Sequence, residues 1–294
     1  MGIMKEISVK ALAKINLGLD VVRRREDGYH EVRMIMQTIH LYDLLEIQKI
    51  REPEIQIVSN LSFLPVNENN LVYKAARLLQ EEFALTDGIS VKLTKRIPVA
   101  AGMAGGSTDA AAMLYAMNQL YDLGLSRREL MKRGVQIGAD VPYCLMRGTA
   151  LAEGIGEKLT QLPPMIKCPV LIAKPSISVS TKFVYQNLKL DEQTNHPDID
   201  ALMKDIREKD FDGVCAHMGN VLESVTIPNY PVIAEIKQQM MRSGAKASMM
   251  SGSGPTVFGL FEDGETAKRA LREMKRSGLA KQVYLTSIYN NARK

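Results

Sequence analysis

A chain of 294 residues is too long for one small core, so two domains of roughly 150 residues are expected. The composition is 46% hydrophobic and 24% charged, which is typical of a globular protein and excludes a disordered chain. The net charge of +5 is spread along the sequence, so it favours anionic ligands only weakly and excludes a concentrated basic tail.

The cysteines and the N-terminal residues predict a cytoplasmic protein. Cys144, Cys168 and Cys215 lie far apart and show neither CxxC spacing nor a disulfide framework, which fits a reducing compartment. Lys5 and Glu6 interrupt any apolar run, so we expect no signal peptide and no membrane-spanning segment. Myristoylation is not expected either, because Glu6 stands where that motif requires Ser or Thr.

The first half of the chain is predicted to interleave strands with helices. Alternating and β-branched residues predict strands over 5–22, about 31–48, 54–59 and 89–97. The spacing of apolar residues predicts helices over 69–84, with Asn69 and Asn70 as candidate caps, and over about 107–123, where Gly124 ends the helix. A shorter helix follows the capping-box pair Ser126 and Glu129 and ends near Gly138, because Pro142 comes next.

The second half begins near residue 163, where prolines and a loss of periodicity indicate a linker. Strands are predicted over 169–175 and 282–288, with a strand-turn-strand over 248–261. Helices are predicted over about 199–206, 212–222, 231–243 and 264–277. The sequence therefore predicts an α+β or mixed α/β protein with domains at 1–162 and 163–294.

Residues 98–112, PVAAGMAGGSTDAAA, form a loop of small residues that enters a predicted helix. The N-terminus of a helix presents unpaired N–H groups, and small residues let an anion approach them, so the loop favours a phosphate. The chain has no Gly-Lys pair for a Walker A motif, and the glycine spacing does not fit GxGxxG. The alternative is a tight turn before an Ala-rich helix that packs on a sheet.

The loop resembles the P-x-x-x-G-L-G-S-S-A motif of the GHMP kinases, which include galactokinase and the homoserine, mevalonate and phosphomevalonate kinases. Two further segments are similar to motifs of that superfamily, namely residues 13–17 (AKINL) and 251–256 (SGSGPT). Within it, AKINLGLDVVRRREDGYHEV at 13–32 and GADVP at 138–142 resemble the 4-diphosphocytidyl-2-C-methyl-D-erythritol kinases.

This resemblance implies a fold and an activity. The implied fold is the two-domain α+β GHMP kinase fold: an N-terminal domain like domain 2 of ribosomal protein S5, a ferredoxin-like C-terminal domain, and an active site in the cleft between them. The implied activity is ATP-dependent phosphorylation of the cytidine diphosphate-linked polyol in the non-mevalonate route to isoprenoid precursors. The alternatives are another kinase of the superfamily, acting on mevalonate or homoserine, or a basic RNA-binding protein. Diffuse charge and an aromatic content of 5% argue against RNA.

The resemblance also implies catalytic roles for Lys14 and Asp140. Asp140 would accept the proton of the substrate hydroxyl, and the Lys14 charge would favour the ionised carboxylate. From the residues alone, a turn-forming aspartate is the favoured interpretation of Asp140, and a solvated lysine on the outer face of a strand is that of Lys14.

On the substrate side, the resemblance assigns Tyr29 and His30 to the cytosine ring, with Tyr185 as the opposite wall. Asn16, two residues from Lys14, would point to the same face of the strand and orient the hydroxyl end of the substrate or a phosphate, with a cross-strand hydrogen bond as the alternative. Thr181 would touch the ribose or diphosphate, although a helix-capping hydroxyl is an equal alternative. Met36 stands where some family members carry another aromatic residue.

For ATP, the predicted binding residues also include Lys95 and Asn70, whose alternatives are a solvated lysine and a helix cap. The remaining ATP-binding positions are those of the loop: Pro98, Val99, Ala100, Ala101, Gly102, Met103, Ala104, Gly105, Gly106, Ser107 and Thr108. Mg²⁺ is expected to be carried mainly by the nucleotide phosphates, with no dedicated protein metal site. The expected partners are therefore small molecules, with neither nucleic acid nor membrane, for a monomer or homodimer.

Overall fold

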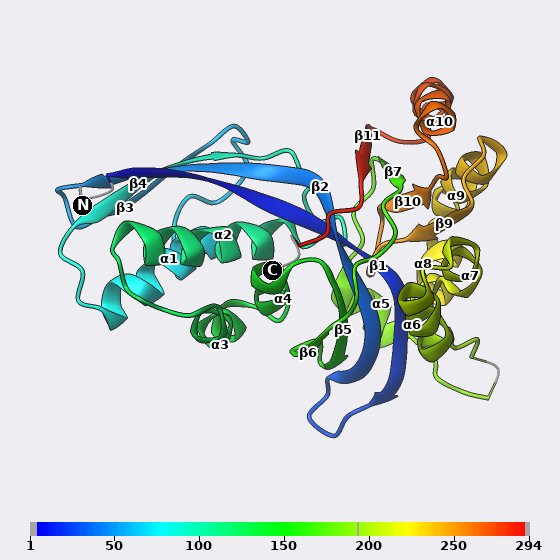
Figure 1. Cartoon of the computed structure of the whole chain (residues 1–294), viewed down its shortest axis with the longest axis horizontal. Helices are drawn as coiled ribbons and strands as arrows, with labels where there is room; N and C mark the ends of the chain where they lie inside the picture. The colour runs from blue at the N-terminus through cyan, green and yellow to red at the C-terminus, as the bar shows by residue number, and fades with distance from the viewer. Residues whose placement is uncertain (1–4, 193, 292–294) are drawn as a thin grey trace. The chain divides into compact units, whose positions relative to one another are not determined.

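The computed structural model describes residues 5–192 and 194–291 (Figure 1). The chain forms two compact units, of which unit 1 comprises Met1–Ala13, Leu41–Val99 and Ala104–Met146. Unit 2 comprises Lys14–His40, Ala100–Met103 and Arg147–Lys294. The long strands β1 (Glu6–Arg24) and β2 (His30–Ile50) therefore contribute to both units, and the small-residue loop is divided between them. The domain boundary between residues 162 and 163 stays a prediction.

Unit 1 is a sheet covered by helices on one face (Figure 1). The parts of β1 and β2 in this unit are joined by β3 (Ile55–Ser59) and β4 (Gly88–Thr94), in the order β3-β4-β2-β1. The helices are α1 (Leu71–Glu82), α2 (Gly105–Leu120), α3 (Arg127–Ile137) and α4 (Val141–Met146). Alternate residues of β3 are buried, as the alternation in its sequence predicts.

Local signals set the ends of these helices. The Asn70 side chain accepts the Val72 amide to begin α1, and Ser126 and Glu129 form the predicted capping box of α3. Helix α4 was not predicted. Pro142 is tolerated there because it lies in the first helical turn, where its missing N–H has no intrahelical partner to lose.

In unit 2, short strands pair with the remaining parts of β1 and β2. Strand β5 (Thr149–Gly154) pairs antiparallel with β2 and with β6 (Lys158–Gln161), and the sequence did not reveal the hairpin that β5 and β6 form.

The predicted helix over 212–222 is wrong. Helix α7 (Phe211–His217) ends early, β8 (Gly219–Asn220) pairs parallel with Gly18 and Leu19 of β1, and α8 (Glu223–Asn229) follows.

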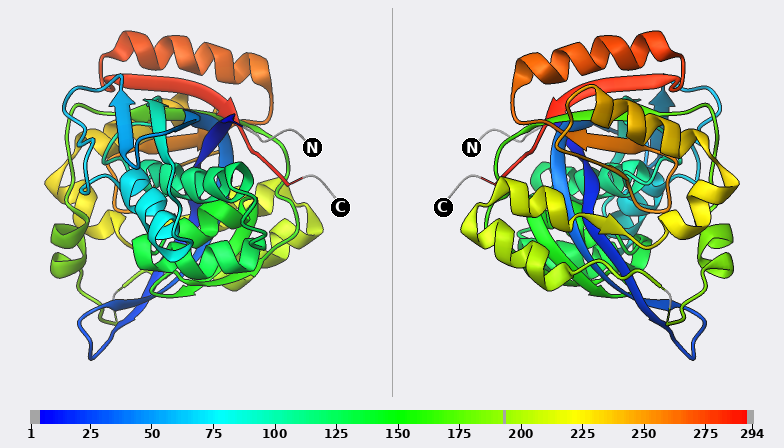
Figure 2. Two further views of the ribbon diagram at one scale, coloured as in Figure 1. Left: turned by 90° about the vertical axis from the view of Figure 1, so that its left-hand side faces the viewer. Right: turned by 90° about the vertical axis from the view of Figure 1, so that its right-hand side faces the viewer.

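The C-terminal part of unit 2 is a four-stranded antiparallel sheet. Its strands are β7 (Pro169–Lys174), β9 (Ala247–Met250), β10 (Val257–Leu260) and β11 (Gln282–Ser287), in the order β11-β7-β10-β9. Helices α9 (Val232–Arg242) and α10 (Gly264–Ser277) pack on it, and Figure 2 shows α10 alongside β11. The order of the strands and their two helices is ferredoxin-like, as expected.

The periodicity of α10 explains its packing. Ala267, Ala270 and Met274 are buried at helical spacing, whereas charged residues occupy the other face.

The remaining helices of unit 2 are α5 (Thr181–Asn187) and α6 (Ile199–Glu208). Within 5–192 and 194–291, every helix is too short or too polar to cross a bilayer.

Candidate active site

The N-terminus of α2, in unit 1, leaves backbone amides free for a ligand. Ala104 is its N-cap residue, with φ of 56°, and no side chain in 5–192 or 194–291 caps the helix. The Thr108 amide bonds to the Ala104 carbonyl, so the amides of Gly105, Gly106 and Ser107 precede the first intrahelical bond. These donors, together with the helix dipole, make a site for an anion.

The space around these glycines differs from one to the next. A Cβ on Gly106 would meet only Leu71, at 3.5 Å, which is an ordinary contact. A Cβ on Gly105 would lie 3.3 Å from Ile97 and 3.4 Å from the Lys95 Nζ, which is tighter. Packing within the protein therefore requires glycine less strictly at 106 than at 105.

In unit 2, the middle of the same loop packs against the glycine loop, which we define as residues 251–256. The Ser251 hydroxyl donates to the Gly102 carbonyl at 3.0 Å. Gly102 has a φ of +71°, and a Cβ there would lie 2.1 Å from the Ser251 carbonyl oxygen. Only glycine fits position 102 in this arrangement.

Lys14 and Asn16 lie next to these loops within unit 2. Both side chains are buried, and the Lys14 ammonium donates to Asn16 Oδ1 at 2.8 Å, so they share one face of β1 as predicted. Asn16 Nδ2 donates to the Met34 sulfur at 3.3 Å, and the Lys14 amide donates to the Met103 carbonyl at 3.3 Å. Lys14 is thus a buried cation, and the solvated-lysine alternative is wrong.

Asp140 lies in unit 1, between α3 and α4. Its backbone carbonyl accepts the Cys144 amide as α4 begins, and its side chain is half-buried. Its carboxylate has no hydrogen bond or ion pair among residues 5–192 and 194–291. Position 138 is close to α2, because a Cβ on Gly138 would lie 3.9 Å from the Ser107 hydroxyl. Asp140 therefore follows a turn that contacts the anion site of the same unit.

The residues predicted to bind cytosine come from separate elements of unit 2. The rings of His30 and Tyr185 lie 5.1 Å apart between centroids, at 43°, whereas Tyr29 is 62% exposed. Burial, followed by the positive charge of Arg24, lowers the pKa of His30 and favours the neutral imidazole, which can both donate and accept. Met36 is fully buried and belongs to the core.

Thr181 contacts the glycine loop, and its neighbour Ser180 caps α5. Ser180 caps α5 by accepting the Phe183 amide at 3.3 Å, so the capping alternative for Thr181 is wrong. The Thr181 hydroxyl instead shares a hydrogen bond of 2.8 Å with Ser253 in the glycine loop. This hydrogen bond places Thr181 next to the glycine loop, which is one of the segments that resemble GHMP kinase motifs.

Lys95 and Asn70 are engaged by the protein in unit 1. Asn70 caps α1, accepting from Val72 at 2.9 Å and donating to the Pro65 carbonyl at 2.7 Å. Lys95 is buried, and its ammonium pairs with Asp43 and, at 2.6 Å, with Asp109, which excludes the solvated-lysine alternative. Nucleotide binding by either residue stays a prediction.

Sequence reasoning missed Asp43 and Asp109. Asp43 also accepts the amides of Arg96 and Ile97, the latter at 2.8 Å, directly before the loop. Burial raises the pKa of Asp109 well above its ordinary value, the Lys95 charge opposes this and the Asp43 charge adds to it. The only signal in the sequence was an aspartate inside each apolar element, which does not reveal the partner.

Comparisons with known proteins show the family to which this chain belongs. The family model described as GHMP kinases N terminal domain matches residues 70–148, and that described as GHMP kinases C terminal matches residues 202–280. This chain belongs to the GHMP kinases, and as a kinase of that family it uses ATP. The resemblance drawn from the three sequence motifs is confirmed, and so is the two-domain α+β fold that it implied.

Named relatives show that the similarity extends over nearly the whole chain. The chain is 59% identical over 286 residues to 4-diphosphocytidyl-2-C-methyl-D-erythritol kinase of Lachnospira eligens, covering 97% of this chain and 99% of that protein. The kinase of that name from Lachnoclostridium phytofermentans is 55% identical and covers 98% and 99%.

Solved structures show the same relationship. A crystal structure of 4-(cytidine 5'-diphospho)-2C-methyl-D-erythritol kinase superposes with a TM-score of 0.84 at 30% identity, covering 97% of this chain and 100% of that one. Homoserine kinase from Cytophaga hutchinsonii superposes with a TM-score of 0.80 at 21% identity, covering 98% and 96%, and shows the shared fold.

Proposed function

We propose that this protein transfers the γ-phosphoryl group of ATP to the 2-hydroxyl of 4-diphosphocytidyl-2-C-methyl-D-erythritol. The products are the 2-phosphate and ADP, in the non-mevalonate pathway to isoprenoid precursors. The observation that carries the proposal is the 59% identity, over nearly the full length of both chains, to a kinase with that name.

Phosphoryl transfer requires that the phosphates be held and their charge be balanced. We assign the phosphates to the free amides of Gly105, Gly106 and Ser107, because no side chain among the described residues caps that helix end. When bound with ATP, Mg²⁺ would neutralise part of the phosphate charge, and the Ser107 hydroxyl would be a suitable protein oxygen to hold it. No group of three or more His, Cys, Asp or Glu suited to a metal exists among the described residues.

The acceptor hydroxyl must lose a proton as it attacks. Its oxygen bonds to the γ-phosphorus, the bond from that phosphorus to the β,γ-bridging oxygen breaks, and we assign the released proton to the Asp140 carboxylate. A carboxylate without a partner in its own unit is free to accept it. We assign Lys14, a buried cation bonded to Asn16, to lower the proton affinity of the hydroxyl.

The cytidine end of the substrate needs a flat apolar surface and a neutral hydrogen-bonding group. We assign these roles to Tyr29 and Tyr185 and to His30, and we assign Thr181 to the ribose or diphosphate. The lowered pKa of His30 supports a neutral imidazole that pairs with the edge of the base. The other GHMP substrates, mevalonate and homoserine, carry no base for these residues to hold.

The test is a substrate panel with radiolabelled ATP. Label should appear on the cytidine diphosphate polyol and not on mevalonate or homoserine. Asp140→Asn should lower turnover by a factor of about 10³ while the KM for ATP changes less than threefold, since a general base acts mainly in the chemical step. Asp212→Asn, an exposed aspartate on α7, is the matched control. Normal turnover in Asp140→Asn would refute the assigned base.

A further inference from the structure

The segment 220–223, which runs from the last residue of β8 to the first residue of α8, holds the start of the glycine loop within unit 2. Asn220 Nδ2 donates to the Met250 carbonyl at 2.9 Å and to the Gly252 carbonyl at 2.8 Å. Glu223 Oε1 accepts the Met250 amide at 2.8 Å. Three side-chain hydrogen bonds therefore fix the backbone on both sides of Ser251.

Asn220 is buried, with 8% of its surface exposed, and its amide group is fully used. Both N–H bonds of Nδ2 go to the loop carbonyls, and Oδ1 accepts the Leu222 amide at 3.0 Å. Among uncharged side chains, only glutamine carries the same two donors and carbonyl acceptor, and its stem is one methylene longer. Glu223 is anchored in turn, because its Oε2 accepts from Lys237 at 2.5 Å.

The backbone at 250–252, which Asn220 holds, contacts the small-residue loop. Ser251, between the two carbonyls, donates its hydroxyl to the Gly102 carbonyl at 3.0 Å. A Cβ on Gly252 would lie 3.2 Å from that same carbonyl oxygen and 3.7 Å from Asn16 Oδ1. A shift of the loop at 251–252 would therefore move the contact that supports Gly102.

We propose that Asn220 is a positioning residue for ATP binding, which acts through Ser251 on Gly102. This inference rests on the proposed role of the small-residue loop in holding ATP. Asn220 itself touches neither nucleotide nor substrate in this proposal. Asn220 holds the backbone of the glycine loop in place. The glycine loop in turn holds the middle of the small-residue loop in its position and orientation.

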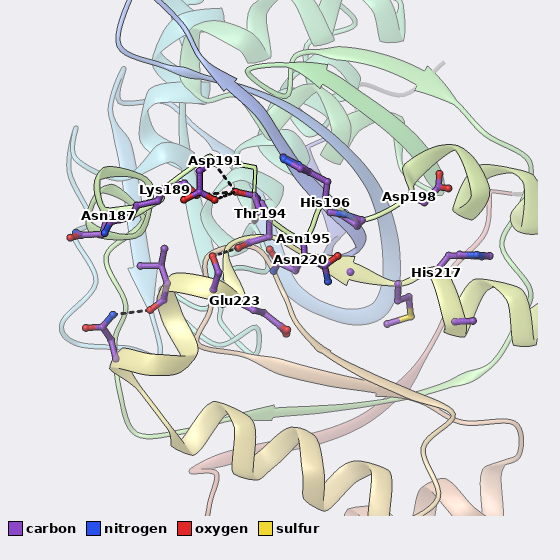
Figure 3. Close-up of a pocket in the computed structure, with 18 residues that line it drawn as sticks. Asn187, Lys189, Asp191, Thr194, Asn195, His196, Asp198, His217, Asn220 and Glu223 are labelled. Carbon is purple, nitrogen blue, oxygen red and sulfur yellow. Dashed lines mark hydrogen bonds between the residues drawn. The ribbon is translucent and has the colours of Figure 1, made fainter.

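A second asparagine, which does not contact the glycine loop, provides a matched control for Asn220. Asn220 and Glu223 line a cavity of about 910 Å³, which Figure 3 shows with polar side chains around it. Asn229 lines the same cavity from α8, but within the described part of the chain its amide donates only to the Val225 carbonyl of its own helix, at 2.8 Å. Asn229→Ala thus removes an amide from the cavity wall without touching the glycine loop.

The first measurement is binding of a nonhydrolysable ATP analogue, by calorimetry, to the whole protein. Asn220→Ala should weaken binding at least tenfold and lower kcat/KM for ATP by a similar factor. The KM for the cytidine diphosphate polyol should rise by a smaller factor, because its predicted base-binding residues lie on other elements, while Thr181 is bonded to the glycine loop through Ser253. Asn229→Ala should remain within twofold of the wild type in each quantity.

The second measurement uses Asn220→Asp and pH. An ionised carboxylate would face two carbonyl oxygens and push the loop away, whereas a protonated one donates to one of them. Between pH 8 and pH 5.5, the affinity of Asn220→Asp for the analogue, relative to wild type at the same pH, should recover at least fivefold. A merely structural loss would not recover on protonation.

Analogue binding within twofold of wild type in Asn220→Ala, or an Asp variant whose relative affinity is constant with pH, would overturn the proposal. If Asn220→Ala fails to fold, the pH comparison in the Asp variant decides. A wild-type protein that binds the analogue but leaves the polyol unlabelled would refute the proposed function, and the analogue measurements would still test Asn220.

Discussion

Gly106→Ala separates the requirements of the fold from those of the ligand. The added Cβ would meet Leu71 at 3.5 Å, a normal contact, and Gly106 lies in the first turn of α2 without a positive φ. Alanine restricts the unfolded chain more than glycine does, so the variant should be as stable as wild type or more stable by roughly 0.5–1 kcal/mol. A phosphate at the Gly106 amide would meet the new methyl group, and the KM for ATP should rise at least tenfold.

The assay combines urea unfolding with ATP kinetics at fixed polyol concentration. Gly102→Ala is the contrasting variant, because its Cβ would lie 2.1 Å from the Ser251 carbonyl oxygen and its φ is positive. That variant should lose both stability and activity. If Gly106→Ala is stable and its KM for ATP stays within twofold of wild type, the anion does not sit at this helix end.

Further predictions concern charge and backbone strain. Lys95→Met leaves Asp43 and Asp109 buried without their cation and should cost about 3–5 kcal/mol in urea unfolding; a loss below about 1 kcal/mol would contradict this. Because the pKa of Asp109 is raised in the folded protein, its contribution to stability falls as pH rises above about 3.9. Asp109→Asn should therefore gain stability relative to wild type over that range, and a constant difference would refute the assignment. Because the pKa of His30 is lowered, the KM for the polyol should stay flat down to about pH 6.5 and rise only at lower pH. His30→Gln should remove that rise, whereas a rise with a midpoint above pH 6.5 would contradict a neutral His30. Ala104 has a φ of 56°, so Ala104→Gly should raise the melting temperature by a few degrees, through a gain of roughly 0.5–1 kcal/mol. A fall in melting temperature would show that the strain relieved at Ala104 is smaller than the entropic cost of glycine.

Local chemistry explains which elements could be predicted. The capping box at Ser126 and Glu129, the Asn70 cap and the periodicity of α10 each involve residues within a few positions of one another, so the sequence displays them directly. The short β8 has no such signal. It is a strand only because Gly219 and Asn220 meet Gly18 and Leu19, which lie about 200 positions earlier.

The candidate site divides in the same way. The sequence by itself determined the family, the small-residue loop at a helix start and the shared face of Lys14 and Asn16, because each depends on residue type and short spacing. The tertiary structure alone decided that Lys95 is paired with Asp43 and Asp109, 52 and 14 positions away, and that Asn220 holds the glycine loop. A buried charge or amide must find its partner wherever the fold brings one, and no local pattern records that partner.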